Sequence, residues 1–251
     1  MINHHTEFTV MTCNAGNGRA KPERLAQVLL ASGADVIGLQ EVSDGQAEAL
    51  ARQLSAKYPH QALFPGGFAG KALLSRYPLV HIEQLQLSTV RPDLLVRLKM
   101  GELLLSLIVA HPPPPHLFWT GIRFDPQTWQ QIQVLAKLAG ESPPAILLGD
   151  FNLADWWGEY AYLRATGLQD AFATAGKKPG YTLPLRIGPW RRLKTINRML
   201  TWLPLIPVLR VDYIWHTREL NSLDAWVGED TGSDHLPVLA RLALEANPST
   251  G

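Results

Sequence analysis

Two short stretches decide how this chain folds and where its chemistry lies: Gly149-Asp150-Phe151-Asn152 and Gly232-Ser233-Asp234-His235. The first follows the apolar run Ala145 to Leu148, which has the length and composition of a buried strand. Side chains two apart on an extended segment point to the same face, so Asp150 and Asn152 are expected to lie together at the end of this strand. The second stretch places an acid beside an imidazole just before another apolar run, Leu236 to Leu242.

The composition is that of a globular protein with a large core. The chain has 251 residues, of which 46% are hydrophobic, so it is long and apolar enough to exclude disorder. The single cysteine, Cys13, excludes an internal disulfide. The longest apolar run, Leu103 to Ala110, contains Ser106 and is too short to span a bilayer. No signal peptide is recognised, and we expect a cytoplasmic monomer without a transmembrane segment.

The net charge of +1 is unevenly distributed. Eight lysines and arginines and no acid lie between Ala171 and Val211, whereas the rest of the chain holds 15 basic and 22 acidic residues. A basic segment in an acidic body indicates an anionic partner, although a solvated loop has the same composition.

Strand and helix patterns alternate along the chain without a linker long enough to separate domains. Extended apolar patterns predict strands over 8–13, 36–40, 72–74, 94–99, 103–110, 145–148, 211–215 and 236–242. The strands on either side of Gly101 are expected to form a hairpin, and helical patterns follow Pro22, Ala47 and Trp129. This mixture predicts two β-sheets with helices outside them, in a single domain whose core spans about residues 6–244.

Eight polar side chains lie at or beside the ends of these apolar segments, where separate strands can converge on one site. They are Asn14, Glu41, His111, Asp150, Asn152, Asp212, Asp234 and His235. An unpaired carboxylate at the buried end of a strand is costly, so Glu41 needs a partner. A hard divalent cation meets that need, because Mg²⁺ takes few carboxylates and leaves positions for phosphate oxygens. A single cysteine and the lack of a histidine cluster argue against structural zinc.

Taken together, these residues make the sequence similar to the endonuclease/exonuclease/phosphatase superfamily. The matching blocks follow the family's order over roughly residues 6–244; they are Thr12-Cys13-Asn14, Leu39-Gln40-Glu41, Ala72-Leu73-Leu74-Ser75-Arg76-Tyr77-Pro78, Val109-Ala110-His111, Gly149-Asp150-Phe151-Asn152, Val211-Asp212-Tyr213-Ile214 and Ser233-Asp234-His235-Leu236-Pro237-Val238. The resemblance implies a four-layer α/β sandwich, in which two packed, mostly antiparallel β-sheets are flanked by helices. It also implies metal-dependent hydrolysis of a phosphoester. Gly16 departs from abasic-site endonucleases, which usually carry an acid at that position.

The resemblance and the chemistry of phosphoester hydrolysis suggest roles for five of these eight polar residues. Glu41, with Asp234 and Asn14, would hold Mg²⁺ or Mn²⁺ next to a phosphoryl oxygen. Asp150 would orient and deprotonate the attacking water, and Asn152 would donate a hydrogen bond to the phosphate in the transition state.

A second group of residues is expected to meet the charge of the phosphate. His235, paired with Asp212, would be held in one tautomer and charged, and His111 would add a second donor. Arg76 is explained equally well by a phosphate contact and by a structural ion pair. Whether Asp150 or the His235–Asp212 pair is the general base is left open by the sequence.

The basic, Trp-containing insertion at about 183–209 is expected to overhang the site and to select the substrate. Arg191, Arg192 and Lys194 lie between tryptophans, a composition that suits a nucleic-acid backbone with stacked bases. The apolar stripe of 186–203 suits a membrane surface equally well. An amphipathic helix packed on the protein body is the third interpretation.

Two functions are therefore expected. The first is a Mg²⁺- or Mn²⁺-dependent nuclease that cleaves DNA by in-line attack of an activated water. The second is a hydrolase of small-molecule, inositol or lipid-head-group phosphoesters, which the near-neutral net charge slightly favours. A binding protein with an inactive site is disfavoured, because all the acidic and imidazole positions are present.

Overall fold

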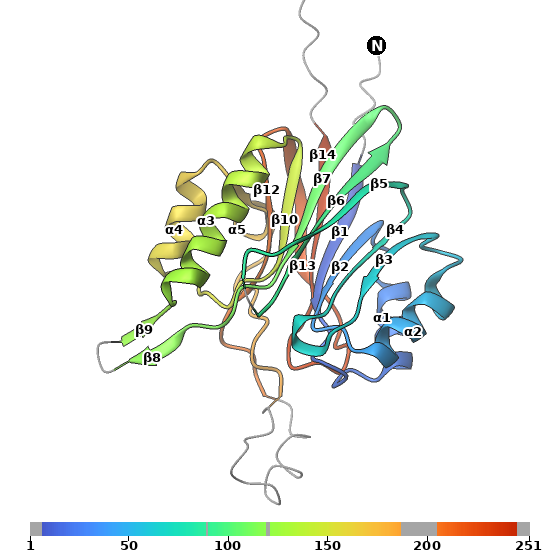
Figure 1. The fold of residues 1–251 in the computed structure, drawn as a ribbon, viewed down its shortest axis with the longest axis horizontal. Coiled ribbons are helices and arrows are strands. Elements are labelled where there is room, and N and C mark those ends of the chain that lie inside the picture. Colours follow the sequence, from blue (N-terminus) through green and yellow to red (C-terminus); the bar gives the residue numbers. More distant parts are fainter. Residues whose placement is uncertain (1–6, 89, 119–120, 187–204, 245–251) are drawn as a thin grey trace, which may run out of the picture.

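The computed structural model of the chain describes residues 7–88, 90–118, 121–186 and 205–244, and in these it contains two six-stranded β-sheets (Figure 1). The first sheet has the order β13 (Leu220–Val227), β14 (Val238–Leu244), β1 (Glu7–Asn14), β2 (Val36–Gln40), β4 (Lys71–Ser75) and β3 (His60–Phe64). The second has the order β11 (Gln169–Asp170), β12 (Asp212–His216), β10 (Ala145–Asp150), β7 (Leu103–Ala110), β6 (Asp93–Met100) and β5 (Leu79–Leu85).

Helices cover the outer faces of both sheets, which gives the expected four layers (Figure 1). On the first sheet lie α1 (Pro22–Ala31) and α2 (Asp44–Leu54), and on the second α3 (Pro126–Glu141) and α4 (Gly158–Ala165). The short helices η1 (Gly67–Ala69) and α5 (Ala171–Ala175) lie in connections. A small hairpin of β8 (His116–Phe118) and β9 (Gly121–Arg123) projects from the body (Figure 1).

The two sheets have matching topologies. Each is antiparallel except for one central parallel pair, β1 with β2 in the first sheet and β7 with β10 in the second. The prediction of two packed, mostly antiparallel sheets is therefore confirmed. Parallel strands bring their carboxyl ends to one edge, so each sheet presents two such ends there.

The core lies between the sheets and is tightest at their centre. Side chains of both inner faces, including Val10, Leu148 and Ile214, form one cluster of buried residues. At Gly38 of β2 a Cβ atom would lie 2.3 Å from Cδ1 of Leu148 and 3.0 Å from Cγ2 of Val109. The absence of a side chain at Gly38 therefore lets β2 approach the opposite sheet.

The sequence patterns predicted the central strands and missed those at the edges. The hairpin about Gly101 is confirmed, with Lys99 opposite Leu104 and a φ of 64° at the glycine. The strands that were not predicted include β3, β5 and β13, which end their sheets. Five of the seven residues of β5 are exposed, so the strand carries no apolar alternation to recognise.

None of the helices in the described parts of the chain is long and apolar enough to cross a membrane.

Replacing Gly149 with alanine should destabilise the fold strongly. A Cβ at this position would lie 1.9 Å from the carbonyl oxygen of Ala110 on β7, and the φ of 150° disfavours a side chain. We expect the free energy of unfolding to fall by about 2 kcal/mol or more, measured by urea denaturation. Gly140→Ala in α3 is the control: no atom lies within 4 Å of its Cβ position, so stability should be equal or up to about 1 kcal/mol higher. Equal urea midpoints for the two variants would contradict this packing constraint.

Candidate active site

Strand ends bring all eight expected polar residues to one edge of the two sheets. Asn14 ends β1 and Asp150 ends β10, while Glu41 and His111 directly follow β2 and β7. The antiparallel neighbours begin where these strands end: Asp212 pairs with Asp150, and Val238, just after Asp234-His235, pairs with Thr12. The convergence is therefore a consequence of the strand directions in both sheets.

Asp150 is the centre of this group and is almost completely buried. Its Oδ2 atom accepts a hydrogen bond of 3.0 Å from the Asn14 amide and lies 3.3 Å from Nε2 of His111 and 3.8 Å from Nε2 of His235. Its Oδ1 atom accepts the backbone N–H of Asn152. Burial alone would raise its pKa, but the charge of His235 and the hydrogen bond from the Asn14 amide hold the pKa of this carboxyl well below its usual range.

His235 and Asp212 form a buried hydrogen-bonded pair. Nδ1 of the imidazole lies 3.0 Å from Oδ2 of Asp212, and the other carboxylate oxygen of Asp212 is buried without a hydrogen-bond partner among the described residues. Burial lowers the pKa of His235, but the negative charges of Asp212 and Asp150 outweigh it and raise that pKa to about 10. At neutral pH this imidazole is therefore a cation, which donates from Nδ1 to Asp212.

Glu41 is held in a strained backbone conformation at the end of β2. Its φ is 55°, which is costly for a residue with a side chain, and its carbonyl accepts the N–H of Asn17 at 2.8 Å. Burial and the charges of Asp150 and Asp234 raise the pKa of the Glu41 carboxyl to about 7. The strained turn thus places a third carboxylate where negative charge is already in excess.

This donor set fits a divalent cation. Glu41, Asp150 and Asn14 supply hard oxygen atoms, and a cation would relieve the repulsion that raises the pKa of Glu41. Asp150, Asp212 and His235 also have potential ligand atoms within 4.8 Å of one another. A protonated histidine that already donates to Asp212 is not a ligand, so we favour the carboxylates on the Glu41 side. Asp234 lies at the rim, where Oδ2 is ion-paired with Nη1 of Arg19 at 2.7 Å.

Arg91 is a site residue that the sequence patterns did not indicate. Its Nη1 lies 2.6 Å from Nε2 of His111, and its charge counteracts the raised pKa of Glu41. Burial lowers the pKa of His111 to about 4, so the ring is neutral at pH 7 and accepts from Arg91 through Nε2. In this arrangement the guanidinium, rather than His111, offers the additional N–H donors. In the sequence, the one feature that could have pointed to Arg91 is its position before Pro92, just ahead of β6.

The four expected substrate contacts have two different outcomes. The structure does not bring Arg76 to the site: it follows β4 at the opposite edge, where Nη1 contacts Oδ1 of Asp35 at 2.7 Å. The alternative interpretation, a structural ion pair, accounts for this residue. Arg191, Arg192 and Lys194 lie outside the described residues, as does 187–203 of the stretch considered for membrane contact.

The first described end of the insertion is hydrogen-bonded to the loop that carries Asp234, and the second end is hydrogen-bonded to the first. The N–H of Leu185 donates to the carbonyl of Asp234 at 2.7 Å, and the N–H of Leu205 donates to the carbonyl of Leu185 at 2.8 Å. Arg186 donates to the carbonyl of Ser233 and to Asp230. The insertion therefore leaves and re-enters the fold beside the site.

Comparisons with known proteins identify the family of this chain and agree with its fold. The sequence profile described as Endonuclease/Exonuclease/phosphatase family matches residues 11–235. The protein YbhP of Escherichia coli (strain K12) is 28% identical over 74% of this chain and 68% of its own length. The chain belongs to the endonuclease/exonuclease/phosphatase family, and as a member it is a phosphoester hydrolase.

Solved structures of this family have the same fold. The endonuclease/exonuclease/phosphatase of Bacteroides vulgatus is 19% identical with a TM-score of 0.71, and the match covers 96% of this chain and 100% of that one. Sphingomyelinase C of Streptomyces griseocarneus (18%, TM-score 0.63, 94% and 99% covered) and truncated TDP2 of Caenorhabditis elegans (17%, TM-score 0.63, 94% and 98% covered) are also similar. At these identities the similarity establishes the fold and leaves the substrate open.

Arg210 supports the site from behind. Its guanidinium is buried, donating to Oδ2 of Asp170 at 2.6 Å and to Oδ2 of Asp155 at 3.1 Å. It lies 4.7 Å from the ring centroid of Tyr213, whose hydroxyl lies 2.8 Å from the carbonyl oxygen of Arg210 and 3.1 Å from that of Leu153. These contacts tie the loop after β10 to the segment before β12, and so hold the two strand ends that carry Asp150 and Asp212.

Arg210→Met should destabilise the protein by about 3–5 kcal/mol, because it leaves the buried carboxylate of Asp170 without its cation. Urea denaturation followed by circular dichroism measures the change. Arg164→Met, at an exposed position of α4, is the matched control and should change stability by less than about 0.5 kcal/mol. A loss below 1 kcal/mol for Arg210→Met would show that this network does not hold the two strand ends together.

Proposed function

We propose that this protein is a divalent-metal-dependent phosphodiester hydrolase that cleaves DNA by in-line attack of an activated water. One observation carries the proposal: the buried, ionised carboxylate of Asp150 lies within 3.0–3.8 Å of Asn14, His111 and His235. A carboxylate that is kept ionised by the His235 cation and the Asn14 amide, beside the strained Glu41, can orient a water molecule for attack on phosphorus.

Asp150 is the better candidate for the base. A general base must be unprotonated when the reaction begins, and His235 is charged at neutral pH because of Asp212 and Asp150. The depressed pKa of Asp150 keeps it ionised and able to accept the water's proton in a hydrogen bond. His235 then acts as a cation that stabilises the phosphate oxygens as negative charge develops on them.

Glu41, with Asn14 and Asp234 beside it, would hold the metal ion. A bound divalent cation supplies positive charge to a phosphoryl oxygen and to the leaving oxygen. Arg91 and Asn152 would donate to the remaining oxygens: Arg91 contacts His111, and the Asn152 amide donates one hydrogen to the carbonyl of Pro112, next to His111, and has a second N–H. We therefore assign Arg91 a role in phosphate binding alongside His235.

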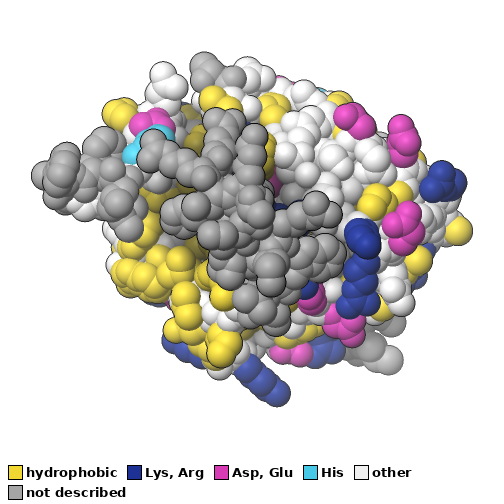
Figure 2. Space-filling model, turned by 90° about the horizontal axis from the view of Figure 1, so that it is seen from below, with side chains coloured by type: hydrophobic (Ala, Val, Ile, Leu, Met, Phe, Trp, Pro, Cys, Tyr) yellow, Lys and Arg dark blue, Asp and Glu magenta, His cyan; other side chains and the backbone are white. Residues whose placement is uncertain are grey.

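DNA is the first substrate to test, because the chain is basic between residues 171 and 211 and resembles TDP2 in fold. A small-molecule, inositol or lipid phosphoester is the second candidate, and a different observation favours it. Hydrophobic side chains gather on the face at which the site strands end (Figure 2). An apolar groove is lined by Tyr181, Ile206, Val208 and Trp226, of which Ile206 is 86% exposed.

Asp150→Asn should abolish hydrolysis, with a loss in kcat of about 10³-fold or more, because the amide cannot accept the water's proton. Removal of divalent ions with EDTA should also abolish the activity of the wild type. Added Mg²⁺ or Mn²⁺ should restore the activity of the wild type but not that of Asp150→Asn. Glu102→Gln, an exposed carboxyl-to-amide change in the turn between β6 and β7, should retain wild-type rates. Equal urea midpoints would show that Asp150→Asn is folded.

The substrates for this experiment separate the two candidates. They are supercoiled DNA, an oligonucleotide, bis-p-nitrophenyl phosphate and phospholipid vesicles. Cleavage of DNA supports the nuclease, whereas turnover of only the small ester or the lipid supports the second candidate. If no phosphoester is cleaved with any divalent ion, the hydrolase proposal is wrong.

The pH dependence of kcat should report the charged state of His235. Its folded pKa is raised to about 10, so the active cation is present below that pH and is lost as the pH rises through it. We expect activity at saturating Mg²⁺ to persist through pH 8 and to fall on the alkaline side. A bound metal cation moves this fall to lower pH by its charge. A rise in kcat between pH 6 and 7 that His235→Asn removes would instead identify neutral His235 as the base.

A further inference from the structure

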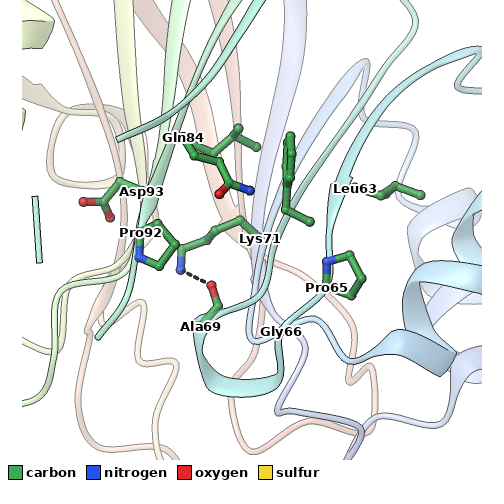
Figure 3. Close-up of a pocket in the computed structure, with 10 residues that line it drawn as sticks. Leu63, Pro65, Gly66, Ala69, Lys71, Gln84, Pro92 and Asp93 are labelled. Carbon is green, nitrogen blue, oxygen red and sulfur yellow. Dashed lines mark hydrogen bonds between the residues drawn. The ribbon is translucent and has the colours of Figure 1, made fainter. Parts of the chain in front are cut away.

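A pocket of about 280 Å³ opens between the two sheets, directly beside the site (Figure 3). Lys71 comes from β4 of the first sheet, whereas Gln84 and Asp93 come from β5 and β6 of the second. Leu63 and Pro65 add apolar wall. Ligand pockets usually measure about 300–1,000 Å³, so this volume suits one substituent of a ligand and not a whole ligand.

Lys71 is the unusual residue of this pocket, because it is a lysine with only 2% of its surface exposed. In the pairing of β2 and β4 it lies opposite Gln40, the residue before Glu41. Its ammonium donates one hydrogen bond, to the carbonyl of Ala69 at 3.1 Å (Figure 3), and among the described residues no carboxylate lies within 4 Å of it. Burying an ammonium with one of three donors used is costly unless another partner is supplied.

Asp93 does not supply that partner. Its Oδ1 atom accepts the backbone N–H of His111 at 3.0 Å, and its Oδ2 atom accepts the Gln131 amide at 2.7 Å. The carboxylate is thus committed to positioning the start of the loop that carries His111. Burial lowers the pKa of Lys71 only to about 8, with Asp93 counteracting the shift, so the ammonium is charged at neutral pH.

The ammonium is also close enough to the site to share its electrostatics. The charged groups that act on Lys71 are Asp93, Arg91, Glu41 and Asp150. Arg91 is a second cation without a carboxylate partner in the described residues, and it repels Lys71. Two cations that contact no carboxylate in the described residues, beside a phosphoesterase site, favour an anion near them.

We infer that the pocket is a subsite for a second phosphate group of the substrate, carried beside the phosphoester that is cleaved and bound by Lys71. The inference rests on the proposed hydrolase function and narrows its substrate class. A phosphate would take the two unused N–H donors of Lys71, and the apolar wall would accept the carbon skeleton between the two phosphates. The second phosphate can belong to a nucleotide or to a phosphorylated polyol.

The test compares ester pairs that differ only in the second phosphate. The nucleotide pair is the p-nitrophenyl ester of thymidine 5'-phosphate with and without a 3'-phosphate. The polyol pair is glycerophosphoinositol with and without a ring phosphate. The measured quantity is the ratio of kcat/KM within each pair. In the wild type we expect a ratio of about ten or more in one pair, and that pair identifies the source.

Variants on the pocket should change this ratio in opposite directions. Lys71→Met should lower it about tenfold, because the methionine keeps the volume and removes the charge. Gln84 lies at the exposed side of the pocket, so Gln84→Glu should lower the ratio and Gln84→Lys should raise it, without a risk to folding. Lys137→Met, on the exposed face of α3, is the control and should leave the ratio unchanged.

Calorimetric binding separates failure of the subsite from failure of the proposed function. Thymidine 3',5'-bisphosphate should bind the wild type about tenfold more tightly than thymidine 5'-phosphate, and Lys71→Met should remove the difference. If no ester is hydrolysed but this difference is found, the subsite stands and the hydrolase proposal falls. If esters are hydrolysed but the second phosphate changes neither rate nor binding in either pair, the subsite is overturned and the hydrolase stands.

Discussion

Close packing of the two sheets at their centres is the constraint on which the site depends. Leu148 of β10 occupies the space that a side chain at Gly38 of β2 would need, so these strands approach each other closely. Asp150 lies two residues after Leu148, and Glu41 lies three residues after Gly38. Both carboxylates then lie close to Nε2 of His111, at 3.3 and 3.6 Å. A larger residue at position 38 would separate the two halves of the site, because each half belongs to a different sheet.

The same packing gives the imidazoles of His111 and His235 opposite protonation states. His111 is buried near the cations Arg91 and Lys71 as well as carboxylates and is neutral, whereas His235 is buried between the carboxylates of Asp212 and Asp150 and is charged. Burial is common to both, so the neighbouring charges decide the outcome. The site therefore has an acidic side around Glu41, which suits a metal ion, and a cationic side around His235, which suits phosphate oxygens.

Much of the fold and of the candidate site could be predicted from the sequence. Central strands are buried on both faces and read as apolar runs, and the polar residues that end them were found for that reason. Edge strands such as β5 are largely exposed and were missed. Arg91 and Lys71 were missed for another reason: a cation in a sequence is usually a solvated surface residue, and only the facing sheet makes these two exceptional.

By itself, the sequence determined the strand ends, the residues placed at them and the family, because apolar periodicity and short polar motifs are local properties. The tertiary structure alone decided that Arg76 lies at the far edge with Asp35, that His235 is charged and that Lys71 is buried beside Glu41. These facts depend on burial and on charges contributed by distant segments. They arise only when β4 pairs with β2 and faces β6, and when β10 pairs with β12, in the folded molecule.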